Sequence, residues 1–103
     1  MSTVEDIKNM IEDNKIILFM KGDPHQPRCG FSAKVVDILK EYKIPFSHFD
    51  ILGDPLVRRD LPQVSDWPTF PQLFIKGEFV GGCDIITEMH MSDELKPLLE
   101  DIE

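Results

Sequence analysis

The chain has 103 residues, of which 42% are hydrophobic, and this length and composition suit one domain with one core. The formal net charge is −8 and no basic stripe is visible, which argues against nucleic acid as a partner. The longest apolar run, residues 16–20, is too short to span a membrane, and the acidic N-terminus is unlike a signal peptide. Two cysteines favour a reducing compartment, the cytoplasm, or an organellar matrix if a transit peptide was removed.

The first half of the chain predicts two helices and two strands. Ser2 and Glu5 have the spacing of a capping box, and apolar residues follow at helical intervals. In the second helix, Phe31, Val35 and Leu39 share one face, and Pro45 prevents its continuation. The expected elements are a helix at about 3–13, a strand at 15–20, a helix at about 30–43 and a strand at 46–50.

The second half predicts a short helix, a hairpin and two further helices. Asp54-Pro55 combines an N-cap with a proline at the first helical position, so a helix should follow and end near Pro62. The other expected elements are strands at 72–75 and 78–80 with a turn at Lys76-Gly77, a helix at 84–89 and a last helix capped by Ser92. This order predicts an α/β fold with a mixed four-stranded sheet flanked by helices on both faces.

Cys29 lies where a proline-containing loop meets the predicted second helix, in the stretch KGDPHQPRCGFS. Unpaired N–H groups and the helix dipole at such a position favour a thiolate, and Lys21 and Arg28 add positive potential. A reactive thiol explains this setting better than an inert buried cysteine. Ser32 stands where a second cysteine would resolve a mixed disulfide, and we expect its hydroxyl to satisfy an N–H group of the first helical turn.

Two later motifs could line a binding site, although each also has an ordinary structural explanation. In WPTFPQL, residues 67–73, a cis bond at Phe70-Pro71 would offer the Phe70 backbone to an extended peptide, and a plain loop is the alternative. In GGCD, residues 81–84, the glycines let a ligand approach, and Asp84 is either an amine-binding group or a helix-start acid. Cys83 shares no metal-ligand spacing with Cys29, which indicates a structural thiol or an oxidation-sensitive one.

In this order and spacing, the motifs resemble the monothiol glutaredoxins over essentially the whole chain, as a single glutaredoxin domain at residues 1–103. The resemblance implies a thioredoxin-like fold, a cis-proline at Pro71 and a glutathione site, and it makes Cys29 the functional thiol. The glutathione-binding residues that it implies are Lys21 and Arg58 (with Arg59 as the second choice) for the glycine carboxylate, the Phe70 backbone for the cysteinyl part, and the Cys83 backbone and Asp84 for the γ-glutamyl end.

A lone cysteine can serve an iron–sulfur cluster if other molecules supply the remaining ligands. A [2Fe-2S] cluster needs four ligands, which Cys29 and one glutathione from each of two subunits would provide. The first hypothesis is therefore a homodimer that carries or donates a glutathione-ligated [2Fe-2S] cluster, with Cys29 as its metal ligand. Iron–sulfur apo-proteins would be the recipients, and the resemblance adds BolA-type proteins as heterodimer partners.

The second hypothesis is an enzyme, a glutathione-dependent thiol–disulfide oxidoreductase that removes glutathione from protein thiols. Cys29 would attack the glutathione sulfur, and free glutathione would resolve the adduct. Both hypotheses use the same pocket. The missing resolving thiol and the long loop between Lys21 and Cys29 favour the carrier, with weak oxidoreductase activity at most. A pure interaction module would leave Lys21, Cys29 and Asp84 without a purpose.

Overall fold

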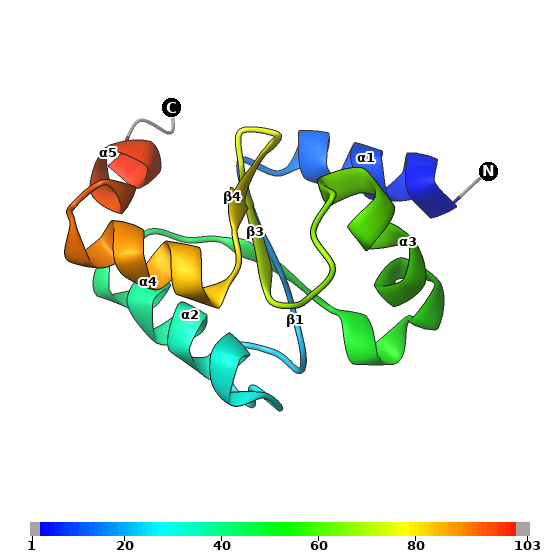
Figure 1. The fold of residues 1–103 in the computed structure, drawn as a ribbon, viewed down its shortest axis with the longest axis horizontal. Helices are drawn as coiled ribbons and strands as arrows, with labels where there is room; N and C mark the ends of the chain where they lie inside the picture. The colour runs from blue at the N-terminus through cyan, green and yellow to red at the C-terminus, as the bar shows by residue number, and fades with distance from the viewer. Residues whose placement is uncertain (1–2, 101–103) are drawn as a thin grey trace.

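A computed structural model of the protein describes residues 3–100, in which a four-stranded sheet lies between two layers of helices (Figure 1). The strands are β1 (Ile16–Met20), β2 (Ser47–Asp50), β3 (Gln72–Ile75) and β4 (Glu78–Gly81), in the order β2-β1-β3-β4. Strand β1 runs parallel to β2 and antiparallel to β3, and β3 pairs antiparallel with β4. The prediction of a mixed four-stranded α/β sheet is confirmed.

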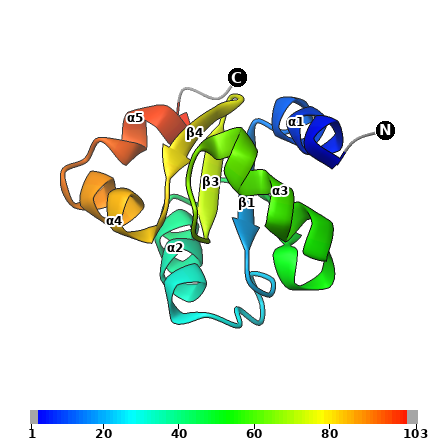
Figure 2. The same cartoon turned by 45° about the vertical axis from the view of Figure 1, so that its right-hand side comes forward.

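The central strand β1 is buried along its whole length, because each face of the sheet is covered by helices. Leu18 contributes to a core beneath α2 (Gly30–Glu41), α4 (Cys83–Met91) and α5 (Leu95–Glu100). Phe19 points to the opposite side, into a core beneath α1 (Thr3–Asp13) and α3 (Pro55–Ser65). Figure 2 shows these two helical layers on either side of the sheet. The apolar strand IILFM therefore supplies both cores in alternation.

The predicted boundaries agree with the structure at most elements, and the differences have local causes. Helix α1 has the predicted bounds, whereas Ser2 of the predicted capping box lies outside the described residues. Helix α3 begins at the Asp54 cap, passes Pro62 and ends at Ser65, before Asp66 adopts a left-handed conformation. A short 3-10 helix at Ile51–Gly53, which the sequence pattern did not predict, precedes it.

The prediction that Ser92 caps the last helix is wrong, because Ser92 instead ends α4. Its N–H group donates to the Glu88 carbonyl at 3.0 Å, and its hydroxyl donates to the Met89 carbonyl at 3.3 Å. These bonds satisfy carbonyl groups that a helix end leaves without partners. Asp93 follows with a φ of 63°, so the chain turns before α5 begins at Leu95.

The loops nearest Cys29 gather at one end of the sheet. The bond between Phe70 and Pro71 is cis, as the family resemblance implied, and it lies directly before β3. At the opposite end of β3, Lys76 and Gly77 both have positive φ values, which confirms the tight hairpin turn.

Among the described residues, no helix has the length and apolar character needed to cross a membrane.

Candidate thiol site

Cys29 occupies the N-cap position of α2 in an extended conformation, so its thiol lies beside the free N–H groups of the first helical turn. The N–H group of Ser32 is the largest of the influences that lower the pKa of Cys29. The N–H group of Phe31, the charge of Lys21 and the Ser32 hydroxyl act in the same direction, against the partial burial of the thiol. This lowered pKa agrees with the predicted thiolate-prone cysteine.

Ser32 does not cap the helix as expected. Its side chain is fully buried, and its hydroxyl oxygen accepts a hydrogen bond from the N–H group of Lys21 at 3.1 Å. The Cys29 sulfur, rather than this hydroxyl, lies against the N–H groups of the first turn. Ser32 therefore joins the end of β1 to the start of α2, and it brings the backbone of Lys21 close to the thiol.

The loop between Lys21 and Arg28 closes on itself. The Lys21 carbonyl accepts from the Arg28 N–H group at 2.8 Å, and the N–H group of Gly22 donates to Asp50 Oδ1 at 2.9 Å. Gly22 has a φ of +89°, and a Cβ there would lie 2.4 Å from the carbonyl oxygen of Gln26. Only glycine fits this position without strain. The loop thus holds Lys21 and Cys29, which are eight positions apart in sequence, at one cleft.

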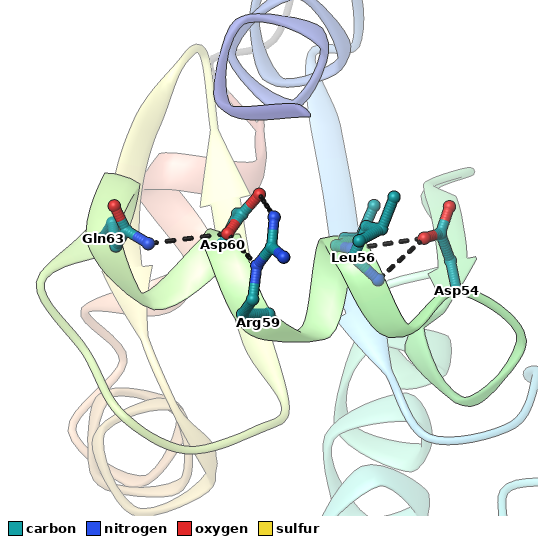
Figure 3. A network of polar contacts seen from close by, with 6 residues as sticks. Asp54, Leu56, Arg59, Asp60 and Gln63 are labelled. Atoms are coloured by element: carbon teal, nitrogen blue, oxygen red, sulfur yellow. Dashed lines mark hydrogen bonds and ion pairs between the residues drawn. The ribbon is translucent and has the colours of Figure 1, made fainter. Parts of the chain in front are cut away.

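The cleft beside Cys29 has a volume of about 400 Å³. It is lined by Lys21, Cys29, Phe31, Arg58, Pro68, Thr69 and Phe70. Arg59, the second choice for a carboxylate-binding cation, does not line it. Arg59 instead pairs with the buried Asp60, through contacts of 2.7 Å from Nε to Oδ1 and 2.9 Å from Nη2 to Oδ2 (Figure 3). The structure therefore favours Arg58 over Arg59.

A smaller pocket of about 170 Å³ adjoins this cleft. It is lined by Phe31, Trp67, Thr69, Phe70, Gly82, Cys83 and Asp84. Because Phe31, Thr69 and Phe70 line both spaces, we describe the two together as the thiol groove. A Cβ on Gly82 would lie 2.9 Å from Trp67 Nε1, so the glycine permits the indole ring to pack against the start of α4.

The thiol groove brings together the six residues that the family resemblance implied, but not Arg28, which was expected to add positive potential and lines neither part. Lys21, Cys29 and Arg58 lie in the larger part, Cys83 and Asp84 lie in the smaller part, and Phe70 lies between them. The Cys83 sulfur lies 4.0 Å from the Thr87 hydroxyl of its own helix. The roles of these residues toward a ligand remain predictions.

Sequence reasoning gave no individual role to four residues that line the groove: Phe31, which it placed in the core, and Trp67, Pro68 and Thr69 of the motif at residues 67–73. Phe31 was placed on the apolar face of the second helix with Val35 and Leu39, which are buried, but its side chain is 62% exposed. The helix extends past the edge of the core at its first turn, so Phe31 stands beside Cys29 in contact with solvent. The sequence signal for this placement was the position of Phe31, an aromatic residue only two positions after the cysteine that begins the helix.

The fold and the site define a thioredoxin-like thiol protein with one cysteine at the start of α2. The sequence profile of the glutaredoxin family matches residues 16–80. The chain is 51% identical over 102 residues to Glutaredoxin 4 of Pasteurella multocida, covering 99% of this chain and 94% of that protein. It is 52% identical over 95 residues to Probable monothiol glutaredoxin 2 of Rickettsia typhi, covering 92% and 86%.

A solved structure of similar sequence agrees with these matches. The solution structure of reduced apo GrxS14 from poplar superposes with a TM-score of 0.82 at 46% identity, covering 95% of this chain and 90% of that one. The chain belongs to the monothiol glutaredoxin family. The resemblance drawn from CGFS, WPTFPQL and GGCD is therefore confirmed at the level of family and fold.

Proposed function

We propose that the thiol groove binds glutathione. Glutathione carries a net negative charge, and a chain with a formal charge of −8 would repel it in the absence of local cations. Lys21 and Arg58 supply such cations in the larger part of the groove, beside Cys29. The smaller part offers Asp84 in the first turn of α4, where an acidic side chain suits an ammonium group. The charge of the groove thus changes sign along its length.

This charge pattern supports one orientation for the tripeptide. Lys21 and Arg58 would hold the glycine carboxylate, and the Phe70 backbone would pair with the cysteinyl part. The backbone of Cys83 and the Asp84 carboxylate would hold the γ-glutamyl end, which carries both a carboxylate and an ammonium group. The glutathione sulfur would then lie near Cys29, between the two ends.

We further propose that the protein carries a glutathione-ligated [2Fe-2S] cluster in a homodimer, as cargo for delivery. The observation that carries this proposal is the isolation of the thiolate-prone Cys29. Within residues 3–100, no group of three or more histidine, cysteine, aspartate or glutamate side chains could hold a metal ion. Cys29 lines the larger part of the groove, whereas the Cys83 sulfur lies 4.0 Å from the Thr87 hydroxyl of its own helix. With one thiolate from each chain, two chains and two glutathione molecules would offer the four that a [2Fe-2S] centre requires.

Family membership supports the remaining parts of this proposal. The recipients would be iron–sulfur apo-proteins, and BolA-type proteins would form heterodimers in which a partner side chain replaces part of the glutathione ligation. Both Cys29 and glutathione must stay reduced to act as ligands, so a reducing compartment such as the cytoplasm fits this role. The acidic surface makes nucleic acid a poor partner.

A second candidate function, removal of glutathione from protein thiols, is favoured by the partial exposure and lowered pKa of Cys29. The Cys29 thiolate would attack the glutathione sulfur of a mixed disulfide and release the protein thiolate. A second glutathione thiolate would then attack the glutathione sulfur bound to Cys29, which releases glutathione disulfide and restores the Cys29 thiolate. The Ser32 hydroxyl supplies no resolving sulfur for this exchange, and its contribution is limited to helping to lower the pKa of Cys29.

Anaerobic reconstitution with iron, sulfide and glutathione tests the carrier proposal. The expected product is a brown dimer with equal amounts of iron and sulfide, and with one glutathione per subunit. A colourless monomer under these conditions, together with efficient turnover of glutathionylated substrates, would replace the carrier with the oxidoreductase.

A further inference from the structure

Gln72 is a fully buried polar residue at the start of β3, directly after Pro71. Its Nε2 atom donates to the carbonyl oxygen of Trp67 at 2.9 Å and to that of Thr69 at 3.0 Å. Its Oε1 atom is buried and has no hydrogen-bond partner within the part of the chain that the structure describes. The side chain therefore makes its polar contacts with a single segment, residues 67–69.

This segment is the wall shared by both parts of the thiol groove. Thr69 lines both parts, Trp67 lines the smaller one and Pro68 lines the larger one. Pro68 and Pro71 have no N–H group, so the segment has few backbone donors of its own. The side chain of Gln72 supplies two donors from beneath it. The Ser65 hydroxyl holds only the Trp67 end, where it accepts from the Trp67 N–H group at 3.2 Å and makes a longer contact of 3.4 Å to the Trp67 carbonyl.

The orientation of the Gln72 amide follows from its partners. Both partners are carbonyl oxygens, which only accept hydrogen bonds, so the reversed amide would place Oε1 against two acceptors. A methionine of similar length would avoid the unpaired Oε1 atom, but it would leave both carbonyl groups without these donors. The geometry thus gives Gln72 a use that an apolar residue lacks.

We propose that Gln72 is a positioning residue for the glutathione site. It holds residues 67–69 so that Thr69 and the Phe70 backbone keep their places along the groove, although Gln72 itself does not line it. This inference rests on the proposed binding of glutathione. The effect of Gln72 on a ligand would pass through the wall alone, since its amide contacts only the carbonyl groups of Trp67 and Thr69.

Trp67 makes the wall directly observable, because it is the only tryptophan in the chain. Gln72→Met removes both donors while keeping the length of the side chain. Leu73→Ala is the matched control, because Leu73 is the next residue, is equally buried and packs in the core beneath α2, α4 and α5. Leu73→Ala should therefore lower the melting temperature without moving the wall.

The experiment measures acrylamide quenching of Trp67 fluorescence in the apo protein and the affinity for glutathione by calorimetric titration. Both are recorded well below the melting temperature of every variant. Gln72→Met should increase the quenching and weaken glutathione binding by about tenfold, since two hydrogen bonds that position the wall are lost. Leu73→Ala should leave both values unchanged.

Gln72→Glu adds a pH-dependent readout. At neutral pH its carboxylate faces two carbonyl oxygens and should loosen the wall, whereas the protonated acid restores one donor. Its quenching should approach the native value as the pH falls. The proposal is overturned if Gln72→Met behaves like Leu73→Ala, with a lower melting temperature but native quenching and native affinity. If the native protein binds no glutathione, the proposed function fails, and the quenching still decides whether Gln72 positions the wall.

Discussion

The two sides of the thiol groove are held in place by different means. On the side of Cys29, the backbone around Lys21 takes part in three separate hydrogen bonds, to Ser32, Arg28 and Asp50. Those partners come from α2, from the far end of the loop and from the end of β2. Losing any one of these contacts leaves the other two, so the position of Lys21 beside the thiol does not depend on a single side chain.

The opposite side depends on two supporting side chains rather than on three separate elements. Residues 67–69 are held by the amide of Gln72 and by the Ser65 hydroxyl, which accepts from the Trp67 N–H group at 3.2 Å and contacts the Trp67 carbonyl at 3.4 Å. The comparison shows that the chain spreads its support over several elements where the thiol and its cation meet. On the opposite side, Thr69 is held by the buried Gln72 side chain, and Trp67 is held by Gln72 and Ser65 together. Substitutions on the two sides should therefore differ in the size of their effects and in the property that they change.

The largest effect is expected from the thiol itself. Cys29→Ser should abolish cluster binding completely, whereas Cys83→Ser should retain it, because Cys29 lines the larger cleft and the Cys83 sulfur lies against Thr87 of its own helix. Iron and sulfide content after anaerobic reconstitution measures both variants. Equal loss of iron from the two variants would mean that Cys83 is also a ligand.

The next effect concerns the cation beside the thiol. A hydrogen bond to a charged group contributes about 1.5–3 kcal/mol, so Lys21→Ala should weaken each glutathione site by about ten- to a hundredfold. The cluster would use two such sites, so the equilibrium constant for assembly of the holo dimer should fall by a factor of roughly 10²–10⁴. Cluster retention during a glutathione titration measures this loss.

Lys34→Ala is the matched control for this charge change, because Lys34 is exposed on α2 and lies outside the groove. It should retain the cluster at native glutathione concentrations, and both apo variants should melt near the native temperature. Identical glutathione dependence for Lys21→Ala and the native protein would show that Lys21 does not hold the ligand.

A smaller effect should follow from the loop that supports Lys21. Gly22→Ala places a Cβ against the Gln26 carbonyl at a positive φ, and we expect a loss of about 2–3 kcal/mol in the free energy of unfolding. Gly30→Ala offers the contrast, because a Cβ there meets no atom within 4 Å and the residue begins α2. It should change the stability by less than about 1 kcal/mol. Urea denaturation distinguishes the two, and similar losses would contradict the close approach at Gly22.

The smallest effect concerns the acidity of Cys29. Its folded pKa is lowered, so the rate of alkylation by iodoacetamide should reach half its maximum at a lower pH than in the urea-unfolded chain. The same shift stabilises the fold at pH values above the unfolded pKa, and this contribution is lost as the pH falls through the folded pKa. Ser32→Ala should move the alkylation midpoint upward, since one donor to the sulfur disappears. An unchanged midpoint would remove the hydroxyl from the list of causes.

Periodic apolar residues and strong local signals made most of the fold predictable. The repeat in α1, the Asp54-Pro55 start of α3 and the Lys76-Gly77 turn each depend on neighbours in sequence, and each was predicted correctly. Ser92 was misassigned because a serine between two helices can end the first or begin the second. Its use depends on the carbonyl groups that α4 leaves free.

The site was less predictable, because its details depend on tertiary placement. Arg58 and Arg59 are neighbours on one helix, and only the position of Asp60 shows which of them faces the groove. Gln72 gave no functional signal in sequence, since its role depends on two carbonyl groups brought beneath the wall by the turn before β3. Family motifs identified residues that line the groove, but not the buried residue behind its wall.

The hydroxyl of Ser32 adds a second connection between Lys21 and Cys29, beside the direct effect of the lysine charge on the thiol. Its oxygen accepts a hydrogen bond from the backbone of Lys21, and the same hydroxyl helps to lower the pKa of Cys29. Coupling between two binding events is always reciprocal. If an anion held by Lys21 changes the proton affinity of Cys29, then deprotonation of Cys29 must change the affinity for that anion by the same factor. The shift in the pKa of Cys29 when Lys21 binds an anion, and the change in anion affinity when Cys29 loses its proton, therefore measure the same coupling free energy.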